Sequence, residues 1–277
     1  MPLAFMDDID GDIRAVESLN FREVGGFIGE RPAVIVPLGG CEPVGEGGAL
    51  GTESVCASAV SAELSKRCRV LAAPAIPFGC STPFISFAGA AGVKPRTFVN
   101  MLCEILHAYV FQGVSRIFLV NAAPFNRGPA GEAARRVEAK YPGVKAAQFD
   151  INNILMDGSD VNNNAGNNDI NNNPRKKGMR DNGGRSGFDR DDALLLSLLA
   201  YLRPNLSVRP NLSVRPNLSD QYQTWKRRGR DPQKLRKLIP DALLLSSGTE
   251  NITPERGKEY FNLIVNIIQI RIENMLY

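Results

Sequence analysis

Along the first half of the chain, blocks of apolar and polar residues predict strands that alternate with helices. Short apolar runs bounded by Gly or Pro are typical of buried strands, and they occupy residues 33–38, 69–79, 115–123 and 144–151. Between them, apolar residues recur at helical spacing in residues 53–67, 95–112 and 131–142. Strands that alternate with helices favour a mainly parallel central sheet covered on both faces, which is a three-layer α/β/α fold.

The regular pattern stops near residue 152 and gives way to two segments of biased composition. Residues 152–186 are rich in Asn and Gly and poor in apolar residues, so we expect a low-complexity insertion that does not fold alone. Residues 203–220 repeat the unit RPNLSV three times, with the last copy ending in Asp. Pro at every sixth position excludes a continuous helix, so we interpret this repeat as a tandem expansion in a surface loop.

Apolar helical patterns return around these two segments. Residues 191–202 predict a strongly apolar helix. The pattern from Thr253 to Leu276 predicts a long helix with Thr253 as its N-cap. We therefore predict a single domain over residues 1–277, which contains both biased segments.

The bulk composition excludes several classes of protein. The chain has 277 residues, 43% of them hydrophobic, and no apolar run approaches the ~18 residues of a membrane span. A net charge of +4 does not indicate a nucleic-acid partner, and the basic run at 226–237 has only Trp225 as an adjoining aromatic. Five Cys without CxxC spacing, and an N-terminal stretch unlike a secretory signal, indicate reduced thiols in a cytoplasmic protein. We expect neither nucleic acid nor a membrane as a partner.

Ligand-binding residues are expected in three loops at the carboxyl ends of the strands, where parallel α/β sheets bind their ligands. These loops are residues 39–53, 78–90 and 121–128. The first reads GGCEPVGEGGALGTE and holds Glu42 and Glu53. Glu42 is either a metal ligand or, more commonly for a lone loop carboxylate, an acceptor of backbone N–H groups. For Glu53 the alternatives are capping of the following helix, which Thr52 or Glu53 opens, and catalysis.

The thiols offer a second kind of chemistry in the same loops. Cys41 and Cys80 lie on neighbouring loops of the predicted sheet, so a nucleophilic Cys41 is one interpretation. A thiol nucleophile needs a base or a cationic neighbour to form its thiolate. The sequence has one His, His107, which falls within the helix before the third strand and at the opposite end of the sheet. Buried, inert thiols are therefore the simpler interpretation.

Three motifs in these loops resemble those of the creatininase family. Residues 37–53, PLGGCEPVGEGGALGTE, are similar without a gap to the family's P-V-G-S-T-E-Q-H-G-P-H-L-P-L-G-T-D. The stretch PFGCSTPFISFAGA looks like P-Y-G-x-S-x-E-H-x-x-F-P-G-T, and IFLVNAAPFN looks like I-V-L-V-N-G-H-G-G-N. Weaker similarities follow at GGRSGFDRDDALLLSLL and SGTENITPERGKEYF. The order and spacing of the motifs agree with the predicted strands, and they imply a creatininase-like α/β/α fold.

The resemblance implies two divalent metals held by a Glu, an Asp and several His, with a water activated between them. Glu42 stands at a ligand position unchanged, and Glu53 stands where the family has a bridging Asp. The other positions depart from the family: Val44, Phe84 and Ala123 replace His, Arg185 replaces a late His of proton transfer, and Phe188 or Arg190 replaces an acidic ligand. Val, Ala and Phe cannot coordinate a metal. We expect no metal, with Glu42 and Glu53 as remnant ligand positions; the alternative is Zn or Mn in a persisting site.

These departures favour a creatininase-like protein that has lost its dinuclear site and acts as a binding, scaffold or assembly subunit. The alternative is an amidohydrolase of non-peptide C–N bonds with a site rebuilt around Glu42, Glu53, Cys41 and Arg185. Arg185 could also bind an anion in the vacated pocket. We expect Val44, Phe84, Ala123, Asn121 and Asn126 to line that pocket, with the two Asn side chains holding the loop backbone. The resemblance further implies a homo-oligomer, or a hetero-oligomer with a paralogue, and leaves a small-molecule ligand open.

Overall fold

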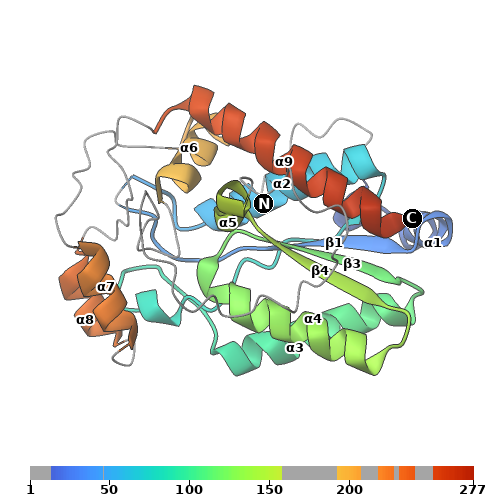
Figure 1. Ribbon diagram of the computed structural model, residues 1–277, viewed down its shortest axis with the longest axis horizontal. Coiled ribbons are helices and arrows are strands. Elements are labelled where there is room, and N and C mark those ends of the chain that lie inside the picture. Colours follow the sequence, from blue (N-terminus) through green and yellow to red (C-terminus); the bar gives the residue numbers. More distant parts are fainter. Residues whose placement is uncertain (1–13, 46, 158–191, 207–217, 228–230, 241–251) are drawn as a thin grey trace.

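The computed structural model describes residues 14–45, 47–157, 192–206, 218–227, 231–240 and 252–277. Its centre is a sheet of four parallel strands in the order β2-β1-β3-β4 (Figure 1). The strands are β1 (Ala33–Leu38), β2 (Leu71–Ala72), β3 (Arg116–Asn121) and β4 (Lys145–Asp150). The helices are α1 (Phe21–Glu30), α2 (Thr52–Cys68), α3 (Pro95–Phe111), α4 (Arg127–Lys140), α5 (Ile151–Asp157), α6 (Asp192–Leu202), α7 (Leu218–Arg227), α8 (Pro232–Leu238) and α9 (Pro254–Leu276). The predicted α/β class is confirmed.

Helices cover both faces of the sheet, as the alternating pattern predicts. In Figure 1, α3 and α4 lie below the sheet, while α2, α6 and α9 lie above it. Successive residues of β1 serve opposite faces because side chains alternate along a strand. Ile35 joins the core under α2, α6 and α9. Val34 and Val36 join the core between the sheet and helices α3 and α4. The strands are buried on both sides, which explains why their sequences are continuously apolar.

The predicted strand over residues 69–79 is much shorter in the structure. Only Leu71–Ala72 pair as β2, and Ile76 makes a single further bridge with Leu38. Pro74 and Pro77 interrupt this segment. A Pro has no N–H to donate to a neighbouring strand, so the ladder cannot continue through these positions. The expectation of a full strand here was wrong.

Helix ends agree with the sequence in some places and correct it in others. The Thr253 hydroxyl accepts from the Arg256 backbone N–H at 3.2 Å, which confirms the predicted cap of α9. The N-cap of α2 is Gly51, so neither Thr52 nor Glu53 occupies the cap position that we expected. The helix predicted from residue 131 starts earlier, at Arg127. The pattern analysis also missed α1, which Asn20 opens with a capping box.

The biased segments lie mostly outside the described residues. Residues 151–157 form α5, in which Ile151 and Ile154 are buried, so the Asn-rich segment begins with ordered helix. The rest of that segment, 158–186, is outside the described range. Of the repeat at 203–220, residues 207–217 are likewise outside it, and residues 218–220 begin α7. No helix in the described ranges is both long and apolar enough to cross a membrane.

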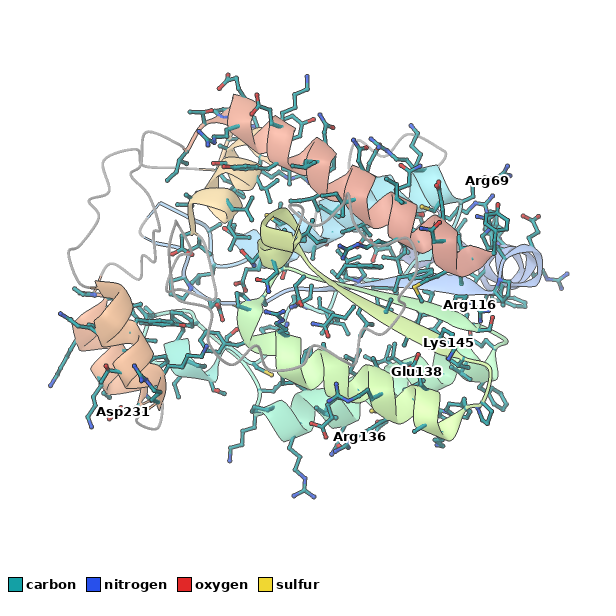
Figure 2. All side chains as sticks on the ribbon, in the orientation of Figure 1. Arg69, Arg116, Arg136, Glu138, Lys145 and Asp231 are labelled. Carbon is teal, nitrogen blue, oxygen red and sulfur yellow. The ribbon has the colours of Figure 1, made fainter. Side chains whose placement is uncertain are left out.

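Charged side chains close the amino end of the sheet. Arg116 donates from Nε to the Met275 carbonyl at 3.0 Å and from Nη1 to the Gly143 carbonyl at 3.2 Å. Glu138 accepts from the Ala146 backbone N–H at 2.9 Å. Figure 2 shows Arg116, Glu138 and Lys145 at this end, away from the loops that follow the strands. The opposite, carboxyl end is therefore where a ligand site is to be sought.

A small helical pair covers one side of that carboxyl end. Helices α7 and α8 bury Tyr222, Trp225 and Leu235 against Phe84 and Phe87 of the loop after β2. Two hydrogen bonds fix the pair: Trp225 Nε1 donates to the Asp231 carbonyl at 2.7 Å, and Ser86 Oγ donates to the Pro232 carbonyl at 2.8 Å. This contact brings the end of α7 toward the loop that follows β3.

Candidate functional site

Asn126 ties together the three loops in which the sequence predicts ligand residues. Its Oδ1 accepts from the Cys80 backbone N–H at 2.7 Å, and its Nδ2 donates to the Gly39 carbonyl at 2.8 Å. Asn126 is fully buried, and Gly79 packs so closely on its amide that a Cβ there would stand 2.6 Å from Nδ2. One side chain thus holds the loop after β3 against the loops after β1 and β2. The expected backbone-holding role of this residue is confirmed.

The three loops meet around Gly40. A Cβ at Gly40 would collide with Glu53 Oε2 and would lie 3.2 Å from Ser81 Oγ and 3.4 Å from Ala123 Cβ. We call Gly40, Glu53, Ser81 and Ala123 the Gly40 cluster. A side chain at Gly40 would displace the Glu53 carboxylate from its place beside this residue. The structure therefore brings together Glu53 and Ala123, which lie 70 positions apart in the sequence.

The two predicted carboxylates are both fully buried in this region, each with a thiol nearby. Burial raises the pKa of Cys80 to about 12, and the Glu42 carboxylate adds to the shift. Burial also raises the pKa of Cys56, with the Glu53 carboxylate as the second cause. These thiols are protonated at neutral pH, because both the low-dielectric surroundings and the nearby carboxylates oppose a thiolate. Neither Cys80 nor Cys56 is placed to act as a nucleophile.

Apolar side chains fill the positions where the family motif has His. Val44 is fully buried in the core under α2, α6 and α9. Phe84 is fully buried among Phe87, Tyr222 and Trp225. Ala123 is 1% exposed and belongs to the Gly40 cluster. All three are buried side chains without a metal-ligating atom, so none of them can coordinate an ion.

The remaining predicted residues are spread more widely. Cys41 is half-buried, and its thiol donates to the Gly89 carbonyl at 3.5 Å. His107 lies within α3, stacked on Tyr141, as expected far from the loops. Arg185, Phe188 and Arg190 fall outside the described residues.

Among the residues that the structure describes, the donors around Glu42 and Glu53 are too few for a dinuclear Zn or Mn centre. Such a centre needs several His or carboxylate ligands around each ion. Within the ranges that the structure describes, no three His, Cys, Asp or Glu side chains lie close enough to hold a metal. Residues 158–191, which contain further Asp side chains, lie outside those ranges. We therefore derive no chemical step through a metal from the described residues.

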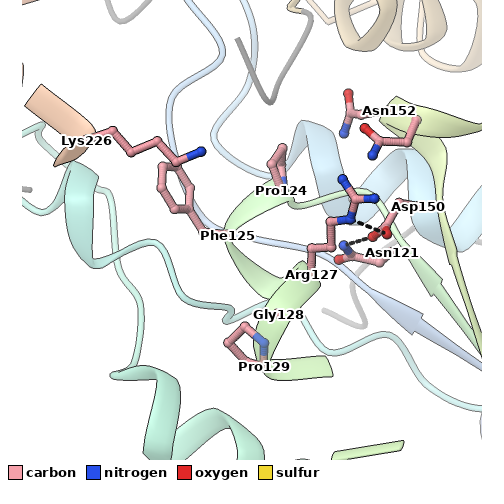
Figure 3. A pocket seen from close by; sticks show the side chains of 10 residues that line it. Asn121, Pro124, Phe125, Arg127, Gly128, Pro129, Asp150, Asn152 and Lys226 are labelled. Atoms are coloured by element: carbon pink, nitrogen blue, oxygen red, sulfur yellow. Dashed lines mark hydrogen bonds and ion pairs between the residues drawn. The ribbon is translucent and has the colours of Figure 1, made fainter. Parts of the chain in front are cut away.

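A cavity that the sequence analysis did not predict opens beside the Gly40 cluster. It has a volume of about 310 Å³, and we call it the β3–β4 cavity (Figure 3). Its polar and aromatic lining includes Asn121, Phe125, Arg127, Asp150, Asn152 and Lys226. In Figure 3, Lys226 reaches in from α7 on one side, while Arg127, Asp150 and Asn152 stand on the other. Asp150 is the last residue of β4 and Asn152 lies two positions later, so the carboxyl end of the fourth predicted strand is the signal in the sequence that could have indicated them.

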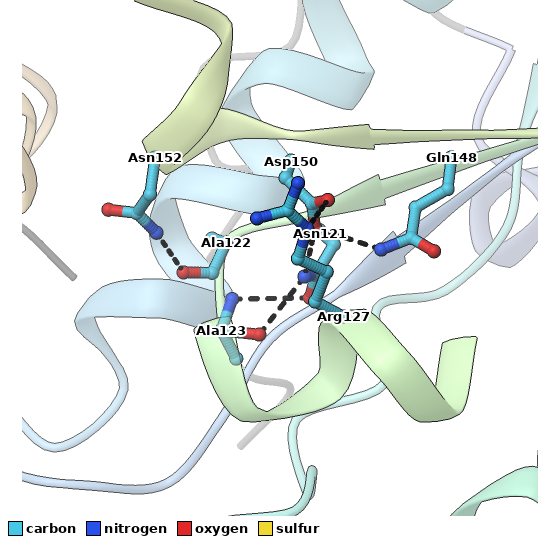
Figure 4. A network of polar contacts seen from close by, with 7 residues as sticks. All are labelled: Asn121, Ala122, Ala123, Arg127, Gln148, Asp150 and Asn152. Atoms are coloured by element: carbon cyan, nitrogen blue, oxygen red, sulfur yellow. Dashed lines mark hydrogen bonds and ion pairs between the residues drawn. The ribbon is translucent and has the colours of Figure 1, made fainter. Parts of the chain in front are cut away.

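A hydrogen-bonded network forms the floor of this cavity (Figure 4). Asp150 Oδ1 accepts from Asn121 Nδ2 at 2.6 Å and from Gln148 Nε2 at 2.9 Å. Asp150 Oδ2 lies 3.3 Å from Arg127 Nε. Asn121 also holds its own loop, since its Nδ2 donates to the Ala123 carbonyl at 3.0 Å. The network fixes the loop after β3 to β4 and keeps a cation at the rim, where 59% of the Arg127 side chain is exposed.

The sequence and the fold were compared with those of known proteins. Residues 17–269 match the creatininase family, which is described as creatinine amidohydrolase. No curated protein is similar enough in sequence to count as a match.

Two solved structures of high similarity share the fold over nearly the whole chain. One is a creatinine amidohydrolase (creatininase), with a TM-score of 0.70 and 16% identity over 95% of this chain and 98% of the other. A second, described as creatininase with Mn, has a TM-score of 0.70 and 15% identity over 95% and 99% of the two chains. At this identity the likeness extends to the fold alone, and the chemistry must be argued from the residues of this chain.

Proposed function

The chain belongs to the creatininase family, and we propose that it is a member that has lost the dinuclear metal centre and acts as a binding or assembly subunit. The packing of Val44, Ala123 and Phe84 carries the proposal. These residues stand where the family motif has His; all three are buried, and Val44 and Phe84 lie in apolar clusters. A metal at Glu42 and Glu53 would have no imidazole ligand from these loops, and His107 lies within α3.

The proposal predicts that the purified protein holds no stoichiometric Zn or Mn. Elemental analysis of protein prepared without chelator tests this. One or two metal ions per chain that are lost in Glu42→Gln and Glu53→Gln variants would contradict the proposal. The same result would favour the alternative, an amidohydrolase with a site rebuilt around Glu42, Glu53, Cys41 and Arg185.

A gain-of-function variant tests the residue positions themselves. The triple change Val44→His, Ala123→His and Glu53→Asp restores three ligands on loops that meet around Gly40. We expect it to bind Zn or Mn measurably in isothermal titration, while the parent does not. The matched control is Val44→Ala, Ala123→Ser and Glu53→Asp, which changes the same positions without adding imidazole. Equal metal binding by both triple variants would contradict the assignment of these positions.

Catalytic activity separates the two candidate functions directly. If the metal centre is absent, the protein has no means of lowering the pKa of water from ~15.7 to about 7, as a catalytic metal does. Creatinine should then remain uncleaved by the parent protein. A creatinine-cleaving activity that co-purifies with the protein and is lost in the Glu53→Gln variant would contradict the proposal.

The assembly part of the proposal concerns other copies of the chain. Closed symmetric assemblies are the common state of soluble oligomers, and the family resemblance favours one here. Light scattering of the protein alone, and after mixing with an active family member, measures whether it forms a homo-oligomer or a mixed one. A monomer under both conditions would rule out the assembly function and leave ligand binding.

A further inference from the structure

The β3–β4 cavity has the charge of an anion site. Two cationic side chains, Arg127 and Lys226, and one carboxylate, Asp150, stand in its lining. The Asp150 charge is already engaged, because Oδ1 accepts two amide hydrogen bonds and Oδ2 pairs with Arg127. The formal charge of the lining is therefore positive. A partly enclosed cationic space of this kind attracts negatively charged ligands.

The start of α4 adds to this positive potential. Arg127, Gly128 and Pro129 form the first turn of α4 and line the cavity. The N-cap residue, Asn126, makes no side-chain cap because its amide is committed to Gly39 and Cys80. In this first turn Pro129 has no N–H and the Arg127 N–H bonds to the Pro124 carbonyl, so the N–H of Gly128 is the one that remains for a ligand. This N–H and the helix dipole favour an anion.

Arg127 retains donors for a ligand. A guanidinium has five N–H groups in a planar fork. Its Nε lies 3.3 Å from Asp150 Oδ2, and its terminal nitrogens face the Asn153 amide, which can accept from them when turned over. These two partners engage at most three of the five N–H groups.

Asn152 indicates that the ligand also carries a donor. Asn152 lines the cavity and is only 6% exposed. Its Nδ2 donates to the Ala122 carbonyl at 2.8 Å, which fixes the amide, whereas its buried Oδ1 has no hydrogen-bond partner among the described residues. A buried acceptor without a hydrogen bond destabilises the protein, so a hydroxyl or amine on the ligand would gain affinity by donating to it.

We propose that the β3–β4 cavity binds a small organic anion, either a carboxylate or a phosphate monoester, that also carries a hydroxyl or amine donor. The anionic group lies between Arg127 and Lys226 near the start of α4, and the donor faces Asn152 Oδ1. The volume of about 310 Å³ suits a molecule of about ten to fifteen non-hydrogen atoms. The proposal rests on the proposed function only in treating the chain as a binding protein, since neither Glu42 nor Glu53 lines this cavity.

Four six-carbon probes test the proposal by isothermal titration on the full-length protein. Gluconate and glucose 6-phosphate carry an anion and hydroxyl donors, hexanoate carries the anion alone, and glucose carries the donors alone. We expect at least one of the first two to bind about tenfold more tightly than hexanoate or glucose, because each of these two controls lacks one of the two kinds of contact. Which of the two binds distinguishes a carboxylate site from a phosphate site. Binding of neither, or equally tight binding of glucose, would overturn the proposal.

Variants locate the binding in this cavity. Lys226→Gln should weaken binding of the anionic probe about tenfold, since it removes one charged donor. The matched control is Lys237→Gln on α8, an exposed Lys that does not line the cavity. Asn152→Leu should weaken binding of the hydroxylated anion and leave hexanoate unchanged. Equal effects of the two Lys variants would place the anion elsewhere and overturn the proposal. The metal content of the parent protein, which tests the proposed function, does not depend on this result.

Discussion

The Gly40 cluster and the β3–β4 cavity lie at the same edge of the sheet but are built in opposite ways. Both use the loop after β3, with Ala123 facing the first and Asn121 the second. The region of the Gly40 cluster is closed, and apolar Val44 and Phe84 fill neighbouring positions. The cavity is open and is lined by two cationic side chains, and 59% of the Arg127 side chain is exposed at its rim. Val44, Phe84 and Ala123, which the motifs align with His of the family, are interior, whereas the adjoining cavity is open and lined by charged side chains.

This difference has a physical consequence for how each region responds to change. A side chain in close-packed interior contributes to stability, so its loss leaves a cavity or an unsatisfied polar group. A side chain at an open rim is already hydrated, so its loss affects ligands more than folding. Substitutions at the Gly40 cluster and its surroundings should therefore lower the free energy of unfolding more than substitutions at the rim of the β3–β4 cavity.

Phe84→Ala should be the most destabilising of these changes, because it empties a fully buried site between the loop after β2 and helices α7 and α8. We expect a loss of about 3–5 kcal/mol in the free energy of unfolding, measured with denaturant. The adjacent Ile85 is 56% exposed and serves as the control. Ile85→Ala should change stability by less than about 1 kcal/mol. Similar losses for both variants would mean that Phe84 is not part of a packed core.

Asn126→Ala should destabilise by somewhat less. It leaves the Cys80 N–H and the Gly39 carbonyl without their partner in a buried place. Each such group costs about 1–3 kcal/mol. Asn262→Ala, at an exposed position of α9, is the control and should change stability by less than about 0.5 kcal/mol. If Asn126→Ala were as mild as the control, the three loops would not depend on this residue.

The buried thiols should make stability fall in alkaline solution. Burial raises the pKa of Cys80 to about 12 and that of Cys68 to about 11, above the ordinary thiol value of 9.0. The unfolded chain then loses these protons first, so the contribution is complete below about pH 9 and is lost as pH rises toward 12. Each thiol contributes at most about 1.4 kcal/mol per pH unit to this loss of stability.

Cys80→Ala isolates one of these thiols. Between about pH 9 and 10.5, its unfolding free energy should fall less steeply than that of the parent, by about 1.6 kcal/mol in total. Denaturant unfolding at several pH values measures both slopes. Parallel slopes would indicate that the Cys80 thiol is accessible to solvent, and that the loop region around it is more open than we describe.

Arg127→Gln should have the smallest effect on stability. The side chain is 59% exposed, and its pairing with Asp150 is screened by water. We expect a loss below about 1 kcal/mol in the free energy of unfolding. A loss as large as that of Asn126→Ala would show that the rim of the β3–β4 cavity is structural, and the contrast between the two regions would fail.

The pattern of apolar residues was enough to predict most elements of the sheet and the edge at which the loops meet. The apolar runs at 33–38, 115–123 and 144–151 gave β1, β3 and β4 with small errors at their ends. These patterns are local consequences of burial on both faces of a parallel sheet, so they can be read without coordinates. The length of β2 could have been limited from Pro74 and Pro77, because the missing N–H is also a local property.

Only the tertiary structure decided which polar residues share a site. Arg127, Asp150 and Lys226 come from α4, β4 and α7, and no spacing rule connects positions so far apart in the sequence. The same holds for Asn126, whose side-chain amide forms hydrogen bonds with Gly39 and Cys80, which lie 87 and 46 positions away. Local patterns record whether a side chain is buried, since that depends on its own polarity and period. Which side chains meet at the end of the sheet depends on loop paths and on the packing of α7 and α8, and these are set by contacts between distant segments.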